Sequence, residues 1–198
     1  PCRVGPILHF IETTATLTEV RLYRSRRRWH ALTVVEFSHA IGRNGSICTV
    51  ALDAVCLSVN EFQTLLECSS TLANLTIRSV IFLTLPDIPA SPEEQLHAAW
   101  SSSRSLRNLK LLGVQVDTTE SLLWVRSETL SSLVLRSLSP LPDTLRVIHF
   151  YLRSIDDDVP EAIGDMLQSA NGHFLESIHF IFSYRDGWFT PIADALKS

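Results

Sequence analysis

The sequence of 198 residues has few of the features that would assign a protein to a specialised class. Its 4 cysteines include no C-x-x-C pair, which begins most structural zinc sites, so we expect no bound metal. No apolar run approaches the roughly eighteen residues that a membrane-spanning helix needs, and we expect no membrane contact. Charged residues make up only 19%, and a net charge of -4 provides no basic field for nucleic acid.

Motifs of the common enzyme classes are also absent. The sequence contains no G-x-S-x-G, no H-E-x-x-H, no G-x-x-x-x-G-K and no G-x-G-x-x-G. We therefore predict a protein that is not an enzyme and has no cofactor. One alternative stays open, a hydrolase that uses a cluster of Cys, His and Asp, because such groups converge only in space.

What the sequence does contain is enough apolar material for a core, with 45% hydrophobic residues. Cys48 and Cys68 lie in apolar surroundings, which is typical of reduced cysteines inside an intracellular protein of the cytoplasm or nucleus. We expect residues 1–198 to form one domain and to be a piece of a longer protein.

The pattern apolar-x-x-apolar-x-apolar recurs along the whole chain, and it is typical of a strand in a repeat protein. The matches are Leu17-Val20-Leu22, Leu32-Val35-Phe37, Ile47-Val50-Leu52, Leu72-Leu75-Ile77, Leu106-Leu109-Leu111, Leu130-Leu133-Leu135, Leu145-Ile148-Phe150 and Leu175-Ile178-Phe180.

Helix starts follow several of these strands. Ser58-x-x-Glu61 and Asp117-x-x-Glu120 lie at the same offset from their strands, and both have the chemistry of a capping box. A third start reads Ser91-Pro-Glu-Glu, with proline at the first helical position, and Asp158-Val-Pro-Glu is a fourth. The segments that follow have helical periodicity, as does an earlier segment at residues 7–11.

Alternating strands and helices at steps of 24 or 25 residues, as from 47 to 72, predict an α/β solenoid similar to leucine-rich repeats. We expect five to six irregular repeats, with parallel strands on the concave face, helices outside and a loop insertion near residues 84–91. Three steps of 15 residues are too short for a full repeat, so some matches are spurious. The match at 32–37 is the first suspect, because residues 29–41 also fit a helix.

The residue pattern of segment 61–68 followed by segment 72–77 resembles the divergent leucine-rich repeats of fungal F-box proteins. The ninth repeat position departs from the usual Asn or Cys, with Val55, Val80, Val114 and Leu138. The resemblance implies a substrate-recognition region of a ubiquitin-ligase receptor. The segment itself contains no F-box, so it does not encode the contact with the ligase adaptor.

Residues between the apolar positions of each strand should point to the concave face. These positions gather basic and aromatic side chains, which suit an acidic or phosphorylated protein partner. The predicted partner-binding residues are Lys110, Arg136, His149, Tyr151, His179, Arg78, Tyr23 and Arg21.

The sequence therefore predicts a protein–protein interaction module, with substrate recognition in an F-box-type receptor as the leading hypothesis. The alternative is the ligand-sensing repeat region of an immune-type receptor. Sequence upstream of Pro1 would distinguish them, since an F-box indicates ubiquitylation and a nucleotide-binding domain indicates sensing.

Overall fold

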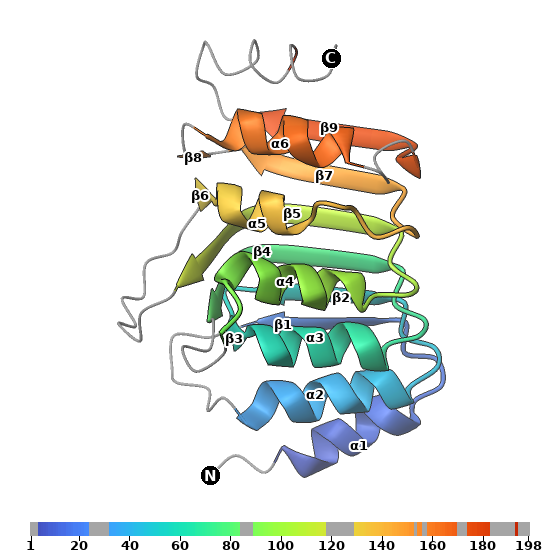
Figure 1. Cartoon of the computed structure of the whole chain (residues 1–198). Helices are drawn as coiled ribbons and strands as arrows, with labels where there is room; N and C mark the ends of the chain where they lie inside the picture. Colours follow the sequence, from blue (N-terminus) through green and yellow to red (C-terminus); the bar gives the residue numbers. More distant parts are fainter. Residues whose placement is uncertain are drawn as a thin grey trace.

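A computed structural model describes residues 4–23, 32–83, 89–117, 129–152, 154–155, 158–169, 174–182 and 193. Helices and strands alternate, and Figure 1 shows the helices side by side on one face of the stacked strands. The helices are α1 (Gly5–Thr13), α2 (Leu32–Arg43), α3 (Val59–Cys68), α4 (Pro92–Ser101), α5 (Ser132–Ser137) and α6 (Val159–Gln168). The strands are β1 (Glu19–Tyr23), β2 (Thr49–Asp53), β3 (Cys56–Ser58), β4 (Asn74–Leu83), β5 (Asn108–Asp117), β6 (Thr129–Leu130), β7 (Val147–Leu152), β8 (Ser154–Ile155) and β9 (Ser177–Phe182).

The main sheet runs in the order β1-β2-β4-β5-β7-β9, and every pairing along it is parallel. The short strand β3 pairs with the second half of β4, and β6 pairs with β8 in a separate small sheet. Because sequential strands are neighbours and helices return the chain between them, this is the predicted α/β repeat array. The six strands along this order, within the described residues, agree with the expected five to six repeats.

Two of the predicted helix starts are capping boxes in the structure. The Ser58 side chain accepts a hydrogen bond from the Glu61 amide, and the Glu61 carboxylate accepts one from the Ser58 amide. Ser91 and Glu94 make the same pair of bonds at α4. The predicted start at Asp158 is also confirmed, although its side chain makes no capping bond.

Two of the predicted strands are wrong, because both segments lie in or run into a helix. Residues 32–37 belong to α2, and in the second segment Leu130 ends β6 while the following residues form α5. An apolar residue every two or three positions also fits the face of a helix, and the buried residues here follow helical spacing: Phe37, Ala40 and Ile41 in α2. Removing these matches removes the repeat steps of 15 residues.

Some predictions fall outside the described residues. These are residues 84–88 of the loop insertion expected near 84–91, and the helix expected after Asp117, which is itself the last residue of β5. In the part of the chain that the structure describes, no helix is long and apolar enough to cross a membrane.

One continuous core lies between the sheet and the helices. Leu75 and Leu109 are fully buried in it, and Leu133 and Ile178 pack against it while partly buried. At its centre the Phe62 ring lies 4.8 Å from Phe82 and 4.7 Å from Trp100, measured between ring centroids. These aromatic contacts join α3, β4 and α4 into one packed unit.

A ladder of backbone hydrogen bonds links each repeat to the next, just before the strands begin. The carbonyl of the residue before each strand accepts two amide hydrogens from the next repeat: Thr18 from Cys48 and Thr49, for example. The same pair of hydrogen bonds recurs at four further carbonyls in the array, those of Cys48, Ala73, Arg107 and Arg146. The ladder links the six strands in the order β1-β2-β4-β5-β7-β9 and fixes their register.

Hydroxyl groups three residues before the strands add a second link between repeats. Thr71 Oγ1 donates to the Ile47 carbonyl at 2.7 Å, and Ser105 Oγ donates to the Leu72 carbonyl at 2.9 Å. At the equivalent place before β7, Thr144 Oγ1 is buried and has no hydrogen-bond partner among the described residues. The second link is therefore missing between β5 and β7.

Three residues at the same place in successive repeats adopt a left-handed backbone. Ala54, Ser79 and Gly113 have φ angles of 53°, 49° and 59°. Each lies five residues after the first residue of its strand, just after the end of β2 and inside β4 and β5. Left-handed backbone is costly for residues with a Cβ and open to glycine, so only Gly113 meets this geometry without strain.

Replacing Leu109 by Ala should lower the free energy of unfolding by roughly 2–5 kcal/mol, because it removes a fully buried side chain and leaves a cavity. Urea denaturation measures this. The matched control is Leu112→Ala on the same strand, whose side chain is only half-buried and should cost clearly less. Equal losses for the two variants would contradict the burial of one face of β5.

Replacing Gly113 by Ala should lower the free energy of unfolding by about 1 kcal/mol, because alanine must adopt a left-handed backbone there. At the equivalent position Ser79, a change from a residue with a Cβ to glycine, Ser79→Gly, should cost much less or stabilise the fold. Denaturation midpoints of both variants test this, and a Gly113→Ala variant as stable as the wild type would refute the assigned geometry.

Candidate functional site

The sheet face turned away from the helices carries three rows of side chains, and we call it the open sheet face. The strand register aligns them residue by residue. The first row is Glu19, Thr49, Asn74, Asn108, Val147 and Ser177; the middle row is Arg21, Ala51, Thr76, Lys110, His149 and His179; the third row is Tyr23, Asp53, Arg78, Leu112, Tyr151 and Ile181.

Seven of the eight predicted partner-binding residues lie on the open sheet face, in the middle and third rows. Arg136 does not, and its predicted place on the concave face is wrong. It belongs to α5, where its Nη2 lies 3.2 Å from an Asp158 carboxylate oxygen that also accepts a hydrogen bond from Ser132. The error follows from treating the helical residues after Leu130 as a strand, and Arg136 instead ties α5 to the start of α6.

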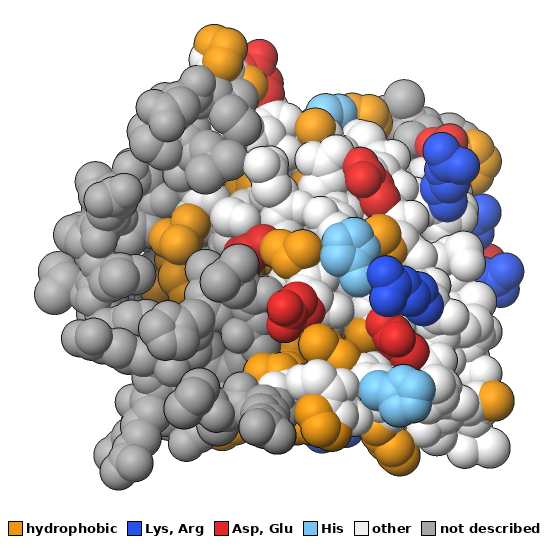
Figure 2. Space-filling model, turned by 90° about the horizontal axis from the view of Figure 1, so that it is seen from below, with side chains coloured by type: hydrophobic (Ala, Val, Ile, Leu, Met, Phe, Trp, Pro, Cys, Tyr) orange, Lys and Arg blue, Asp and Glu red, His pale blue; other side chains and the backbone are white. Residues whose placement is uncertain are grey.

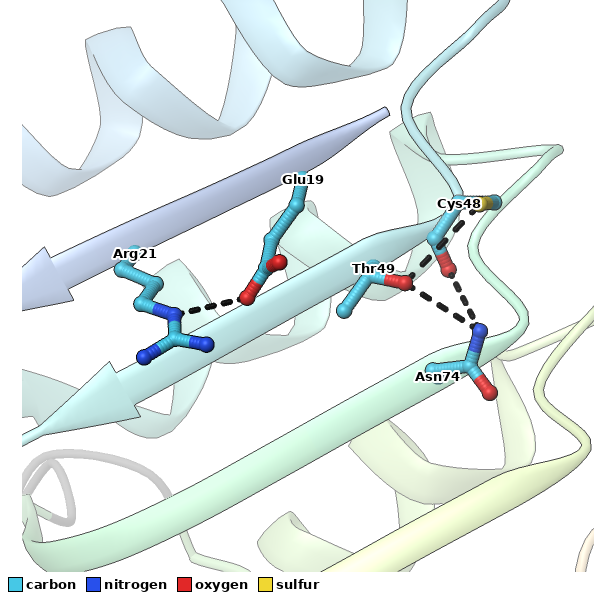
Figure 3. Close-up of polar contacts among 5 residues, drawn as sticks. All are labelled: Glu19, Arg21, Cys48, Thr49 and Asn74. Carbon is cyan, nitrogen blue, oxygen red and sulfur yellow. Dashed lines mark hydrogen bonds and ion pairs between the residues drawn. The ribbon is translucent and has the colours of Figure 1, made fainter. Parts of the chain in front are cut away.

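In the N-terminal half of the open sheet face, the cationic side chains are paired with acidic ones. Arg21 Nε lies 2.6 Å from Glu19 Oε1, as Figure 3 shows, and Arg78 Nε lies 3.9 Å from Asp53 Oδ1. Both arginines are more than half exposed, so these ion pairs add little stability. Their effect is to neutralise the charge of this half of the face.

Two neighbouring side-chain amides, those of Asn74 and Asn108, lie in the first row. Asn74 Nδ2 lies 3.2 Å from Thr49 Oγ1 and 3.4 Å from the Cys48 carbonyl, and Figure 3 shows Asn74 reaching across to the neighbouring strand. Asn108 Nδ2 in turn donates to Asn74 Oδ1 at 2.5 Å. Sequence reasoning missed this row because it aligned only two positions per strand, although the recurring Asn at the first strand position is visible in the sequence.

The C-terminal half of the open sheet face contains bases without acids. Its three strands, β5, β7 and β9, contribute Lys110, His149 and His179 to the middle row, and the other two rows there contain no Asp or Glu. The two histidine rings are stacked, with centroids 4.3 Å apart and planes 7° from parallel. Ser177 Oγ lies 2.8 Å from His179 Nε2 and anchors that ring.

This arrangement lowers the pKa of His149 below its ordinary value. Partial burial is the largest cause, because it disfavours the charged imidazole. The neighbouring His179 and the Lys110 ammonium lower it further by charge repulsion. His149 is consequently neutral over more of the pH range than a histidine in water, and an anion nearby would oppose both effects.

One cysteine–histidine contact bears on the hydrolase alternative. Cys68 Sγ lies 3.6 Å from His39 Nδ1, where α2 packs closely on α3. The approach is so close that a Cβ on Gly42 would lie 2.5 Å from the Cys68 Cβ. Cys68 is the last residue of α3, and His39 lies on the neighbouring α2. The contact therefore fits helix packing better than catalysis.

Among the described residues, no three His, Cys, Asp or Glu side chains are grouped so that they could hold a metal ion. His149 and His179 in particular lack a third such side chain beside them. Figure 2 looks onto the end of the array that carries α1 and β1, and there hydrophobic side chains lie between acidic, basic and histidine side chains. Because its three rows contain bases and no acids, the C-terminal half of the open sheet face is the strongest candidate site.

The stability of the protein should fall as the pH drops below about 6.5. Since the pKa of His149 is lowered in the folded state, the unfolded chain binds a proton first and is favoured in that range. Urea midpoints at pH 7.5 and pH 5.5, measured in chloride, test this. The difference between the two midpoints should shrink in His149→Asn, and an unchanged difference would contradict the lowered pKa of His149.

No family model matches the sequence, and no curated protein matches it at a significant level. Solved structures do match. Actin-binding site 2 of leiomodin-1 aligns with a TM-score of 0.50 at 15% identity, over 100% of this chain and 89% of that chain. The Caenorhabditis elegans tropomodulin C-terminal domain aligns with a TM-score of 0.46 at 13% identity, over 98% and 92%.

A third match, the leucine-rich-repeat-containing protein LegL7 from Legionella pneumophila, has a TM-score of 0.25 at 11% identity and covers 100% of this chain and 94% of that chain. At such low identities the likeness is one of fold, and the leiomodin-1 match has the highest TM-score of the three. None of the three is described as an F-box protein, so that part of the resemblance gains no support. The chain has an α/β fold of the leucine-rich-repeat type, with parallel strands and helices on one side.

Proposed function

We propose that this chain is a non-enzymatic protein-interaction module that binds an acidic or phosphorylated protein through the C-terminal half of its open sheet face. One observation carries the proposal. Three neighbouring strands bring Lys110, His149 and His179 together, and the three rows of those strands contain no acidic side chain. An anionic partner would supply the missing counter-charge.

The cations in the two halves of the open sheet face differ in whether a carboxylate lies beside them, and this difference favours the C-terminal half as the binding surface. Arg21 and Arg78, both predicted to bind the partner, already have the carboxylates of Glu19 and Asp53 beside them. No such ion pair occupies Lys110 within the described residues. A partner would therefore gain more from Lys110 than from either arginine, since it need not displace an existing carboxylate.

Beside the bases, the third row offers apolar and aromatic contact area. It contains Leu112, Tyr151 and Ile181 on the same three strands, and Ile181 is 45% exposed. Tyrosine gives a wide contact at a small entropic cost, and apolar surroundings strengthen a neighbouring charge contact by excluding water. The surface fits a segment in which an anionic residue stands next to an apolar one.

Two finer biological assignments require different domains elsewhere in the polypeptide. Substrate recognition in an F-box-type receptor is supported by the repeat texture of residues 61–77, and it requires an F-box in the same polypeptide. A sensor of the immune-receptor type requires a nucleotide-binding domain instead. The name of the leiomodin-1 fragment makes actin a protein worth including in a binding assay. An intracellular location is consistent with the thiols of Cys48 and Cys68, which form no disulfide.

The test is capture of partners by immobilised wild-type protein and by Lys110→Glu, with purified actin as one of the proteins offered. Lys110→Glu should weaken capture about tenfold, because it replaces an attraction by a repulsion. Unfolding curves confirm that equal amounts of folded protein are compared.

The matched control is Arg104→Glu, which makes the same change of charge on the exposed turn between α4 and β5. It should capture partners as the wild type does. If Arg104→Glu weakens capture as strongly as Lys110→Glu, the net charge of the chain matters and the open sheet face is not the binding surface.

A further inference from the structure

We infer that Lys110, His149 and His179 form a binding site for a single phosphoryl group, carried by a phosphoserine or phosphothreonine of the protein partner. The inference rests on the proposed function, since it names what the same surface recognises. It goes further in choosing the phosphate dianion over a carboxylate and in coupling its binding to proton uptake.

The first argument is geometric. The three residues are neighbours in register on β5, β7 and β9. Adjacent strands lie about 4.8 Å apart, and the two imidazole rings are 4.3 Å apart. Lysine reaches over its neighbours on a flexible stem, so all three side chains can direct donors to one tetrahedral anion above the middle row.

The second argument concerns charge. The His179 ring and the Lys110 ammonium both oppose a positive charge on His149. A phosphoserine carries about −1.5 to −2 charges, whereas a carboxylate carries one. Only the phosphoryl group offers enough negative charge to balance an ammonium and a second cation in the same row. Its binding should therefore draw a proton onto the histidine pair.

The third argument concerns how His179 is held. Its Nε2 lies 2.8 Å from Ser177 Oγ, and a hydroxyl can either donate to a neutral ring nitrogen or accept from a protonated one. The ring keeps this bond in both protonation states, so Nδ1–H stays available as a donor to an anion. Ser177 acts here as a positioning residue, and protonation of His179 breaks no contact.

The charged neighbours do not supply the missing anion. Lys110 on β5 and His179 on β9 flank His149, and Tyr151 follows it on the same strand. One residue before the first row, Arg146 Nε lies 3.9 Å from Glu176 Oε1, so that carboxylate has its own cation. Within the described residues, the middle row of these strands is left with bases alone.

The experiment follows the ring signals of His149 and His179 by NMR from pH 5 to pH 8, in sodium sulfate and in sodium chloride of equal ionic strength. Sulfate is a tetrahedral dianion whose charge is constant over this range. We expect sulfate to make the histidine pair bind its proton about tenfold more tightly than chloride does. Sodium acetate should leave the titration as it is in chloride.

Two variants show which residues are responsible. Lys110→Gln should remove most of the sulfate effect, and Arg104→Gln, on the exposed turn between α4 and β5, should keep all of it. N-acetyl-phosphoserine amide should act as sulfate does, whereas N-acetyl-serine amide and N-acetyl-glutamate amide should not. Chemical shifts of backbone amides show that each variant is folded.

Identical titrations in sulfate and chloride would overturn the inference, and so would an equal effect of acetate or of the glutamate probe. The outcomes also separate this site from the proposed function. A sulfate effect together with protein capture that ignores Lys110→Glu refutes the proposed function and leaves an anion site. Capture that depends on Lys110 without any sulfate effect refutes the phosphoryl site and leaves the protein-binding face.

Discussion

The whole array depends on one backbone interaction, the carbonyl before each strand that accepts two amide hydrogens from the next repeat. From Thr18 to Arg146 this interaction occurs between every two successive strands in the order β1-β2-β4-β5-β7-β9. It uses only main-chain atoms, so it holds whatever side chains the repeats carry. It also fixes the register, because a shift of one residue would exchange the buried and the open positions of a strand.

The candidate site is a consequence of this register. Lys110, His149 and His179 come from segments separated by turns and helices of different length, yet they lie in one row because each stands two residues after the first residue of its strand. The opposite side of the same strands is filled by the core, where Phe150 stacks on Phe180 at 5.5 Å. The open positions are therefore held on a packed and regular support, while their side chains are free to differ from repeat to repeat.

Much of this could be predicted from the sequence, and the reasons differ between elements. Capped helices such as α3 and α4 were predictable because Ser-x-x-Glu states both halves of the interaction. The alignment of His149 with His179 was predictable because their strands match the pattern at the same offset. The strand pattern failed at α2 and α5, since apolar residues spaced by two and three positions fit either a strand or a helix.

Other parts of the site could not be predicted from one sequence. Main-chain bonds leave no trace in residue type, so the carbonyl ladder was invisible. The left-handed backbone at Ala54 and Ser79 was equally hidden, because neither residue prefers that conformation. The pairing of Arg21 with Glu19 and of Arg78 with Asp53 depends on side-chain geometry, and only the structure shows that these cations are already neutralised.

The unpartnered hydroxyl of Thr144 lies at a boundary between repeats that has fewer links than the boundary before it. The strand pair β4–β5 matches over nine positions, whereas the pairs β1–β2, β2–β4 and β5–β7 match over five each. Between β5 and β7 the second hydroxyl link is also missing. Under partial denaturation, the boundary between β5 and β7 should therefore open before the boundary between β4 and β5. Lys110 lies on one side of that boundary and the histidine pair lies on the other. A ligand that contacts both sides would therefore stabilise the boundary between β5 and β7, and binding at the open sheet face should oppose its opening.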